Sequence, residues 1–204
     1  MTAILLSAAA LWAIAVMTPG PNFLLVSHAA LNGSRASALW TVLGIAAGTV
    51  VWGCAGFLGV GFLFVAAPWL YLILKIAGGL YLVWLGGRIL RSALRPPVAV
   101  VPVSGAEGTR RAFTRGLVTA VSNPKSGAFV TSMFAATLPP DPTPALGAAI
   151  VGTMVVLTLS WYGTVTWTLG HERPRRLYGR SRRVIEGLAG GIFILFGLRL
   201  ASGR

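Results

Sequence analysis

Six apolar stretches of roughly membrane-spanning length make up most of the sequence. They run from Ile4 to Val26, Ala38 to Val65, Trp69 to Gly87, Gly116 to Leu138, Ala145 to Leu169 and Val184 to Leu200. A helix needs about 20 apolar residues to cross a bilayer. Only 10% of the residues are charged, and the mean hydropathy is +0.78. The pattern predicts an all-α polytopic membrane protein with six transmembrane helices; the sixth stretch is short, and whether it fully spans stays open.

The charges alternate between the links that join these stretches. The first link carries Arg35, the third is rich in arginine, and the fifth reads HERPRRLYGRSRR, whereas the second (AAPW) and fourth (PPDPTP) have no basic residue. Basic loops favour the cytoplasm, so the odd-numbered links are expected there and both termini outside. Arg199 and Arg204 oppose this orientation weakly. We attribute the net charge of +13 to topology and contact with anionic membrane lipids, not to nucleic-acid binding.

A Pro- and Val-rich stretch, RPPVAVVPVSGAEG, divides the chain near its midpoint. It predicts a cytoplasmic linker loop over residues 95–112, between a three-helix repeat at 1–94 and another at 113–204. Three is an odd number of spans, so the second repeat enters the membrane in the opposite direction to the first. The expected architecture is therefore a pair of inverted repeats.

The first apolar stretch contains TPGPN near its middle. Pro19 and Pro21 lack amide hydrogens, so within a helix they leave the carbonyls of Ala15 and Met17 without their usual partners. Unpaired backbone groups in lipid cost several kcal/mol each, so such a break needs protein or a wet cavity around it. There the freed carbonyls, the new helix terminus and the amide of Asn22 become ligand-binding groups.

The fourth stretch has a comparable break at Asn123, Pro124 and Lys125, where the proline frees the carbonyl of Ala120. The first helix of each repeat is thus interrupted by Pro beside an Asn. Paired broken helices indicate a transport site at the interface between repeats. The alternative is a pair of proline kinks that only shape packing, since prolines are common in transmembrane helices.

Three segments together resemble the LysE/RhtB family of amino-acid exporters: TPGPNFLLV, LKIAGGLYLVWLGGRIL and FTRGLVTAVSNPKSGAFV. The resemblance implies an efflux carrier, not an enzyme, in the bacterial inner membrane, exchanging amino acids or their analogues for protons. The signature positions carried over as substrate-binding candidates are Pro19, Gly20, Pro21, Asn22, Lys75, Asn123, Pro124 and Lys125. The pair Gly78-Gly79 departs mildly from the family's third-span pattern, which has a small residue, often Ala, before the tyrosine region.

Lys75 and Lys125 are the lysines within predicted spans, and Arg199 lies at the very end of the sixth. Each lysine could extend its long stem toward the membrane surface, or face a cavity and hold a substrate carboxylate. No Asp or Glu lies in the interior of a span, which favours neutral, zwitterionic amino acids over lysine or arginine as cargo, although backbone carbonyls could still hold a cation. Glu186 and His28 lie at segment edges, where capping or solvation explains them, so the sequence offers no clear proton-coupling residue.

Two other functions stay open: a non-transporting membrane scaffold or assembly protein, and an exporter of inorganic cations. The scarcity of carboxylates and thiols argues against the second. Two histidines and one cysteine, far apart, suggest no metal site, and no Walker-type loop or other cofactor motif occurs. We expect no cofactor, and a homodimer stays open.

Glycines and tryptophans give two further expectations. Gly44 and Gly48 form a small-xxx-small face, and glycines recur in the sixth span at 187, 190, 191 and 197, so both are expected at close helix contacts. Trp52 is expected deep in the membrane, either packing or lining the cavity. The tryptophans expected at the membrane interfaces are Trp12, Trp40, Trp69, Trp84, Trp161 and Trp167.

Overall fold

The structure, a computed structural model, describes residues 2–66, 68–94, 108–169 and 172–202. Within these ranges it describes the side chains except at 32, 62–66, 68, 70–71, 74–75, 92–93, 172–183, 185–186 and 189. All secondary structure in the described residues is α-helical. The helices are α1 (Thr2–Met17), α2 (Pro21–Asn32), α3 (Arg35–Ala66), α4 (Pro68–Ala93), α5 (Thr109–Val121), α6 (Pro124–Thr137), α7 (Pro144–Leu169) and α8 (Glu172–Ala201).

The two predicted breaks are present as helix ends. The first apolar stretch forms α1 and α2, which are bent by 56° at the break, and the fourth forms α5 and α6. Among the described residues, Arg35–Gly61 in α3 and Pro144–Leu169 in α7 are long and apolar enough to cross a membrane, and the bent α1–α2 pair adds a third candidate. The chain is therefore built as a membrane protein, and the expectation of six spans stays a prediction. Helix α8 begins at Glu172 instead of Val184, so it is much longer than the apolar stretch alone indicated.

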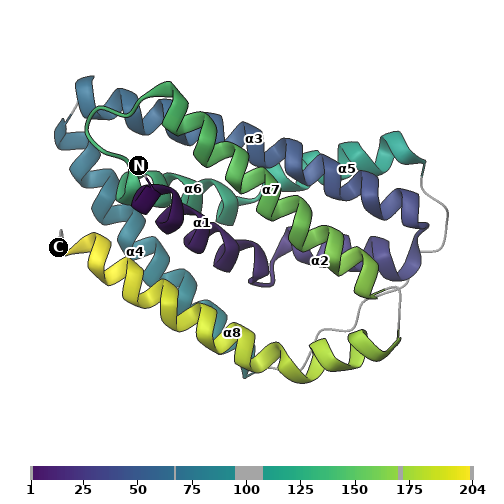
Figure 1. The fold of residues 1–204 in the computed structure, drawn as a ribbon. Coiled ribbons are helices and arrows are strands. Elements are labelled where there is room, and N and C mark those ends of the chain that lie inside the picture. The colour runs from purple at the N-terminus through teal and green to yellow at the C-terminus, as the bar shows by residue number, and fades with distance from the viewer. Residues whose placement is uncertain (1, 67, 95–107, 170–171, 203–204) are drawn as a thin grey trace.

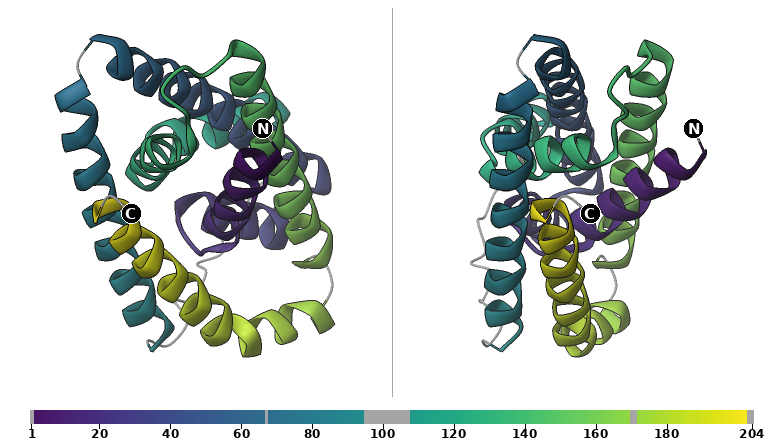
Figure 2. Two further views of the ribbon diagram at one scale, coloured as in Figure 1. Left: turned by 60° about the vertical axis from the view of Figure 1, so that its left-hand side comes forward. Right: turned by 90° about the vertical axis from the view of Figure 1, so that its left-hand side faces the viewer.

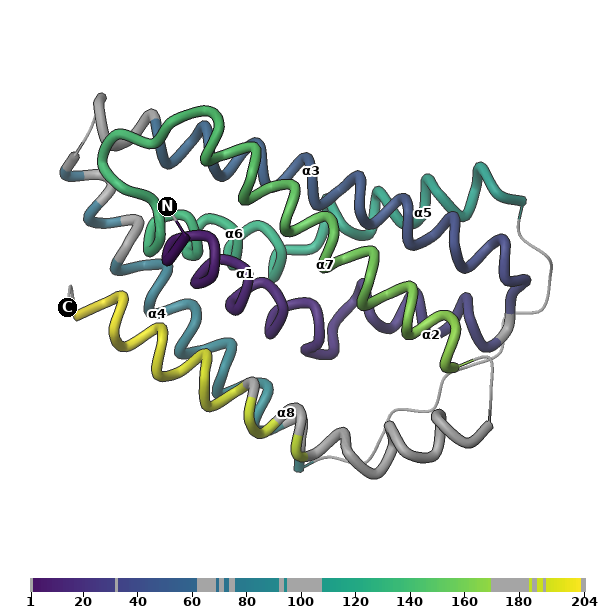
Figure 3. The backbone as a smooth tube through the Cα atoms, in the orientation of Figure 1, coloured from purple at the N-terminus to yellow at the C-terminus, as the bar shows by residue number. Residues whose placement is uncertain are grey.

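The helices run between two ends of the molecule (Figure 1). One end holds the starts of α1, α4 and α7 together with the ends of α3, α6 and α8. The opposite end holds the ends of α2 and α7 and the starts of α3 and α5, as the tube in Figure 3 also shows. The short helices α2 and α5 therefore occupy one half of the molecule's length, and α1 and α6 the other.

Helices α4 and α8 pack closely on one another along one side of the molecule (Figure 2). Their backbones touch at glycines: a Cβ on Gly86 would lie 2.5 Å from the Gly190 carbonyl, and one on Gly197 would lie 2.5 Å from the Gly79 carbonyl. The expected glycine contacts of the sixth span are thus confirmed at 190 and 197. They are wrong at 187 and 191, where no described atom lies within 4 Å of an added Cβ.

Helices α3 and α5 make the second close pair. A Cβ on Gly44 would overlap the Phe113 carbonyl, and one on Gly48 would lie 2.5 Å from Cβ of Ala120. The small-xxx-small face is therefore a helix contact, as predicted. It holds α5, the first half of the second broken helix, against a long straight helix, and so fixes where that break lies.

Aromatic side chains fill the core where α1, α6 and α8 meet. The rings of Trp12 and Phe129 are 6.1 Å apart and those of Phe129 and Phe193 are 5.2 Å apart. Trp12 is only 5% exposed, so its expected place at the membrane interface is wrong. Large apolar side chains such as Leu58 and Leu195 lie on the outside, 67% and 70% exposed, which suits a surface that contacts lipid.

Candidate functional site

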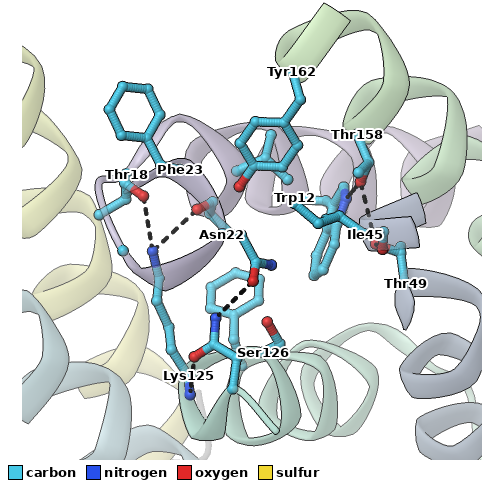
Figure 4. A pocket seen from close by; sticks show the side chains of 15 residues that line it. Trp12, Thr18, Asn22, Phe23, Ile45, Thr49, Lys125, Ser126, Thr158 and Tyr162 are labelled. Atoms are coloured by element: carbon cyan, nitrogen blue, oxygen red, sulfur yellow. Dashed lines mark hydrogen bonds between the residues drawn. The ribbon is translucent and has the colours of Figure 1, made fainter. Parts of the chain in front are cut away.

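The two helix breaks lie face to face across a small buried cavity (Figure 4). Asn22, at the start of α2, and Asn123, just before α6, meet there: Nδ2 of Asn123 donates to Oδ1 of Asn22 at 3.4 Å. Side chains from α1, α2, α3, α6 and α7 line the cavity. Two segments about a hundred residues apart in the chain thus share one polar site.

Lys125 crosses this cavity to the first break. Its ammonium donates to the carbonyl of Thr18 at 3.0 Å and to that of Ala15 at 3.2 Å. Ala15 is four residues before Pro19, so its carbonyl is one that the missing proline amide frees. Both acceptors belong to the C-terminal end of α1, which carries the negative end of the helix dipole and favours a cation. The second half of the chain thereby satisfies backbone groups that the first half leaves unpaired.

The start of α2 presents the opposite polarity to the same cavity. Its N-cap is Gly20, and no side chain caps the helix. Helix α6, in contrast, is capped by its own Asn123, whose Oδ1 accepts from the Lys125 amide at 3.0 Å. The first break therefore offers both a cluster of carbonyls and a positive helix end, whereas the amide end of the second break is already occupied.

The carbonyl freed at the second break is occupied too. Nε1 of Trp52, on α3, donates to the Ala120 carbonyl at 3.1 Å, and this acceptor lies four residues before Pro124. The indole packs on Gly127, where an added Cβ would lie 2.5 Å from the ring. Trp52 thus seals the second break instead of lining the cavity. The two breaks resemble each other in sequence. They differ in the backbone groups that they present to the cavity, because Trp52 and Asn123 already bond those of the second break.

The wall opposite Lys125 carries hydroxyl groups. Trp12 Nε1 donates at 3.0 Å to both the Met154 carbonyl and Oγ1 of Thr158, and Thr158 lies 3.5 Å from Oγ1 of Thr49. Tyr162 lies beside them on α7 (Figure 4). Sequence reasoning did not select any of these residues as part of the site, because a Thr or Tyr within an apolar run gives no sign of which way it faces.

Four of the eight predicted site residues line the cavity: Gly20, Asn22, Asn123 and Lys125. The three prolines do not, and Pro21 and Pro124 are exposed. They shape the site by interrupting the backbone and not by touching its contents. Lys75 lies in α4, and its side chain is outside the described residues.

The cavity is small and contains no acidic side chain in its lining. Its volume is about 30 Å³, which holds about one or two water molecules and is less than an amino acid needs. Among the described residues, no three His, Cys, Asp or Glu side chains come close enough to bind a metal ion together. The groups that could hold a ligand are main-chain carbonyls, a helix N-terminus, two carboxamides, hydroxyls and the Lys125 ammonium.

Comparisons with known proteins agree on a transport family. The model of the family described as "LysE type translocator" matches residues 13–204. The chain is 33% identical to the threonine efflux protein of Escherichia coli (strain K12), over the full length of both. It is 35% identical to that of Salmonella typhi, over 94% of each chain, and 29% identical to the leucine efflux protein of Enterobacter sp. (strain 638), over 92% of this chain and 90% of the relative. No solved structure matches the chain.

Proposed function

Because the chain belongs to the LysE type translocator family, we propose that it exports neutral, zwitterionic amino acids from the cytoplasm across the bacterial inner membrane. The transport is secondary and driven by the proton gradient. The observation that carries the proposal is the contact of Lys125 with the Ala15 and Thr18 carbonyls beside Asn22 and Asn123. A buried site of this kind binds charged groups without a carboxylate of its own.

The first break fits both charges of a zwitterion. The substrate ammonium binds the carbonyls at the end of α1, where a lysine ammonium already lies. The substrate carboxylate lies at the uncapped start of α2, within reach of the Asn22 and Asn123 amides and of the Lys125 ammonium once it leaves those carbonyls. Gly20, between Pro19 and Pro21, keeps the approach open, and Pro124 holds Asn123 and Lys125 at the start of α6. Lys75 stays a further candidate for the carboxylate.

The lining supports a neutral cargo. A lysine or arginine cargo carries a second cation, and the described lining offers no carboxylate for it once the substrate's α-ammonium occupies the carbonyls at the end of α1. Two kinds of relative, the threonine and leucine efflux proteins, are named for amino acids with neutral side chains. The hydroxyls of Thr49 and Thr158 and the rings of Phe129 and Tyr162 surround the space in which a short side chain would lie.

The proposal includes six spans in two inverted repeats, 1–94 and 113–204, joined by the cytoplasmic linker 95–112, with both termini external. The packing supports this arrangement. Helix α3 packs on α7 and α4 packs on α8, so the second and third spans of each repeat pair with their counterparts. Each broken helix also packs on the second span of the opposite repeat: α5 on α3, and α1 on α7. Rocking of one repeat against the other would expose the site to each side in turn.

The test is transport by the purified protein in liposomes, with a panel of radiolabelled neutral and dibasic amino acids and an imposed pH gradient. We expect export of at least one neutral amino acid, stimulated by an inward proton gradient, and a loss of rate of tenfold or more in Asn22→Ala. Gly59→Ala on α3, where no described atom would meet the new Cβ, is the matched control and should transport normally. Transport of no amino acid by the wild type, or only of dibasic ones, would refute the proposal.

A further inference from the structure

The structure places a charged group of the protein itself where the proposed function puts the substrate ammonium. We propose that Lys125 is a tethered ammonium that fills the amino-group subsite of the empty carrier, so that the carrier can close and return without cargo. The substrate ammonium displaces it during export. This inference rests on the proposed function, and adds to it a role for Lys125 in the unloaded half of the cycle.

The first step of the argument is the cost of an empty subsite. The carbonyls of Ala15 and Thr18 belong to a helix end inside the core, and Thr18 is only 1% exposed. If the carrier closed around them without a donor, it would bury unpaired acceptors, which is strongly unfavourable away from water. The ammonium of Lys125 removes this obstacle because it supplies two of its three hydrogens to those acceptors.

The second step is that the subsite holds one cation at a time. The cavity of about 30 Å³ leaves room for water but not for a substrate beside the lysine as it stands. A substrate ammonium can reach the two carbonyls only if Lys125 withdraws. The long side chain of Lys125 gives it the reach to do so, and the carboxylate of the same substrate offers it a new partner.

The third step concerns release. An ammonium held by a carboxylate inside a protein is hard to remove, because separation leaves an unpaired buried charge on each side. The described lining of the cavity contains no carboxylate, and its one further titratable side chain is Tyr162. Lys125 is therefore held by main-chain carbonyl dipoles alone. A substrate ammonium can donate to the same two carbonyls equally well.

The experiment compares two rates in liposomes with Lys125→Met, using a neutral amino acid that the wild type transports. Net efflux into a substrate-free medium requires the empty carrier to return. Exchange of labelled for unlabelled substrate does not, because the carrier is loaded in both directions. We expect net efflux to fall at least tenfold more than exchange.

Chemical rescue distinguishes the loss of the ammonium from a general loss of stability, because it restores the ammonium in the variant protein. In a Cys54→Ala background, Lys125→Cys can be alkylated with 2-bromoethylamine: the thiol sulfur forms a bond to carbon, bromide leaves, and the thiol proton goes to the buffer. The product has a lysine-length side chain ending in an ammonium. Native Cys54 is exposed and would react too, which is the reason for removing it. Alkylation should restore net efflux relative to exchange.

The outcomes separate the two proposals. If net efflux and exchange fall by equal factors, Lys125 only binds the loaded substrate and the tethered-ammonium role is wrong. If neither falls, or if alkylation restores exchange without net efflux, the role is also wrong, while amino-acid export stands. If the wild type moves no amino acid in either assay, the proposed function itself fails.

Discussion

Asn22 and Asn123 occupy matching places beside the two breaks, but only Asn123 caps a helix. Asn123 caps α6 through the 3.0 Å bond from the Lys125 amide to its Oδ1, and it also donates to Asn22. Asn22 lies inside the first turn of α2 and caps no helix, since the N-cap there is Gly20. The two residues therefore separate a contribution to stability from a contribution to the cavity.

Asn123→Ala should lower the free energy of unfolding by about 1 kcal/mol, because that is the usual cost of removing an N-cap side chain. Asn123→Ser keeps an oxygen that can accept the Lys125 amide and should recover most of that loss. Asn22→Ala removes only the long 3.4 Å contact and should leave stability within a few tenths of a kcal/mol. Reversible unfolding of the three variants in one detergent measures these differences. Equal destabilisation by Asn22→Ala would show that α2 depends on a cap that the structure does not contain.

Trp52→Phe removes the indole donor from the Ala120 carbonyl, and with it the distal ring atoms that lie against Gly127. The carbonyl then retains main-chain donors, among them the Asn123 amide at 3.3 Å. We expect a loss of at least about 1 kcal/mol in unfolding free energy, because the usual net value of a hydrogen bond at a partly buried site is added to the lost packing on Gly127. Trp69→Phe is the control, since Trp69 is 68% exposed. If the two variants were equally stable, the indole bond would contribute nothing at the second break.

At the scale of residues, the sequence predicts which backbone groups lose their partners but not which groups replace them. The carbonyls of Ala15 and Ala120 follow from proline chemistry alone, and both are bonded by side chains in the structure. Lys125 and Trp52 come from 110 and 68 residues away, so only the packing of whole helices brings them there. Trp12 shows the same limit: its indole finds acceptors on α7, which nothing near it in the chain indicates.

Among the helices, contact at small residues fixes the positions of α5 and α8. On α3, Gly44 lies directly against the α5 backbone, whereas Gly59 on the same helix faces no described atom within 4 Å. These two glycines share a helix and a residue type, so they isolate the effect of the contact.

Gly44→Ala should push α5 away from α3, because the new Cβ would overlap the Phe113 carbonyl, and backbone cannot move aside as a side chain can. We expect a cost of about 1–3 kcal/mol, typical of overpacking at a tight contact. Gly59→Ala should be neutral or slightly stabilising, since alanine favours the helix. Thermal unfolding and the fraction of monodisperse protein after purification check both. If Gly44→Ala unfolds at the wild-type temperature and stays monodisperse, α3 and α5 lie further apart than the structure places them.

The sequence indicates these contacts unevenly, for a physical reason. A glycine in an apolar helix is compatible with a close crossing but does not say whether a neighbour approaches it. Gly190 and Gly197 meet glycines of α4, while Gly187 and Gly191 meet no described atom within 4 Å. All four are glycines of the same apolar helix, so the sequence does not separate them. The start of α8 was missed because apolar length defines a membrane segment and not a helix, so the basic, polar first part of α8 gave no apolar signal.

For the molecule as a whole, the distribution of charge and the positions of the helix ends agree. Exposed Arg35, Arg110 and Arg111 lie at the end of the molecule where α3 and α5 begin. Asp141 and Arg199 lie at the other end, with the starts of α1 and α7. Among the described residues, arginine gathers at one end and charge is sparse at the other, which is the pattern that orients a membrane protein.

A reporter inserted at residue 105, between α4 and α5, should therefore be cytoplasmic, and one fused after residue 204 should be external. The physical reason is that moving the arginine-rich end across the membrane is strongly disfavoured, while Arg199 is a single charge on the opposite side. Green fluorescent protein should fluoresce at 105 and alkaline phosphatase should be active at 204, each with the other reporter at the same position as its control. The reverse pattern would invert the whole molecule. Export from the cytoplasm would then begin at the end we assign to the outside, and the orientation proposed here would be wrong.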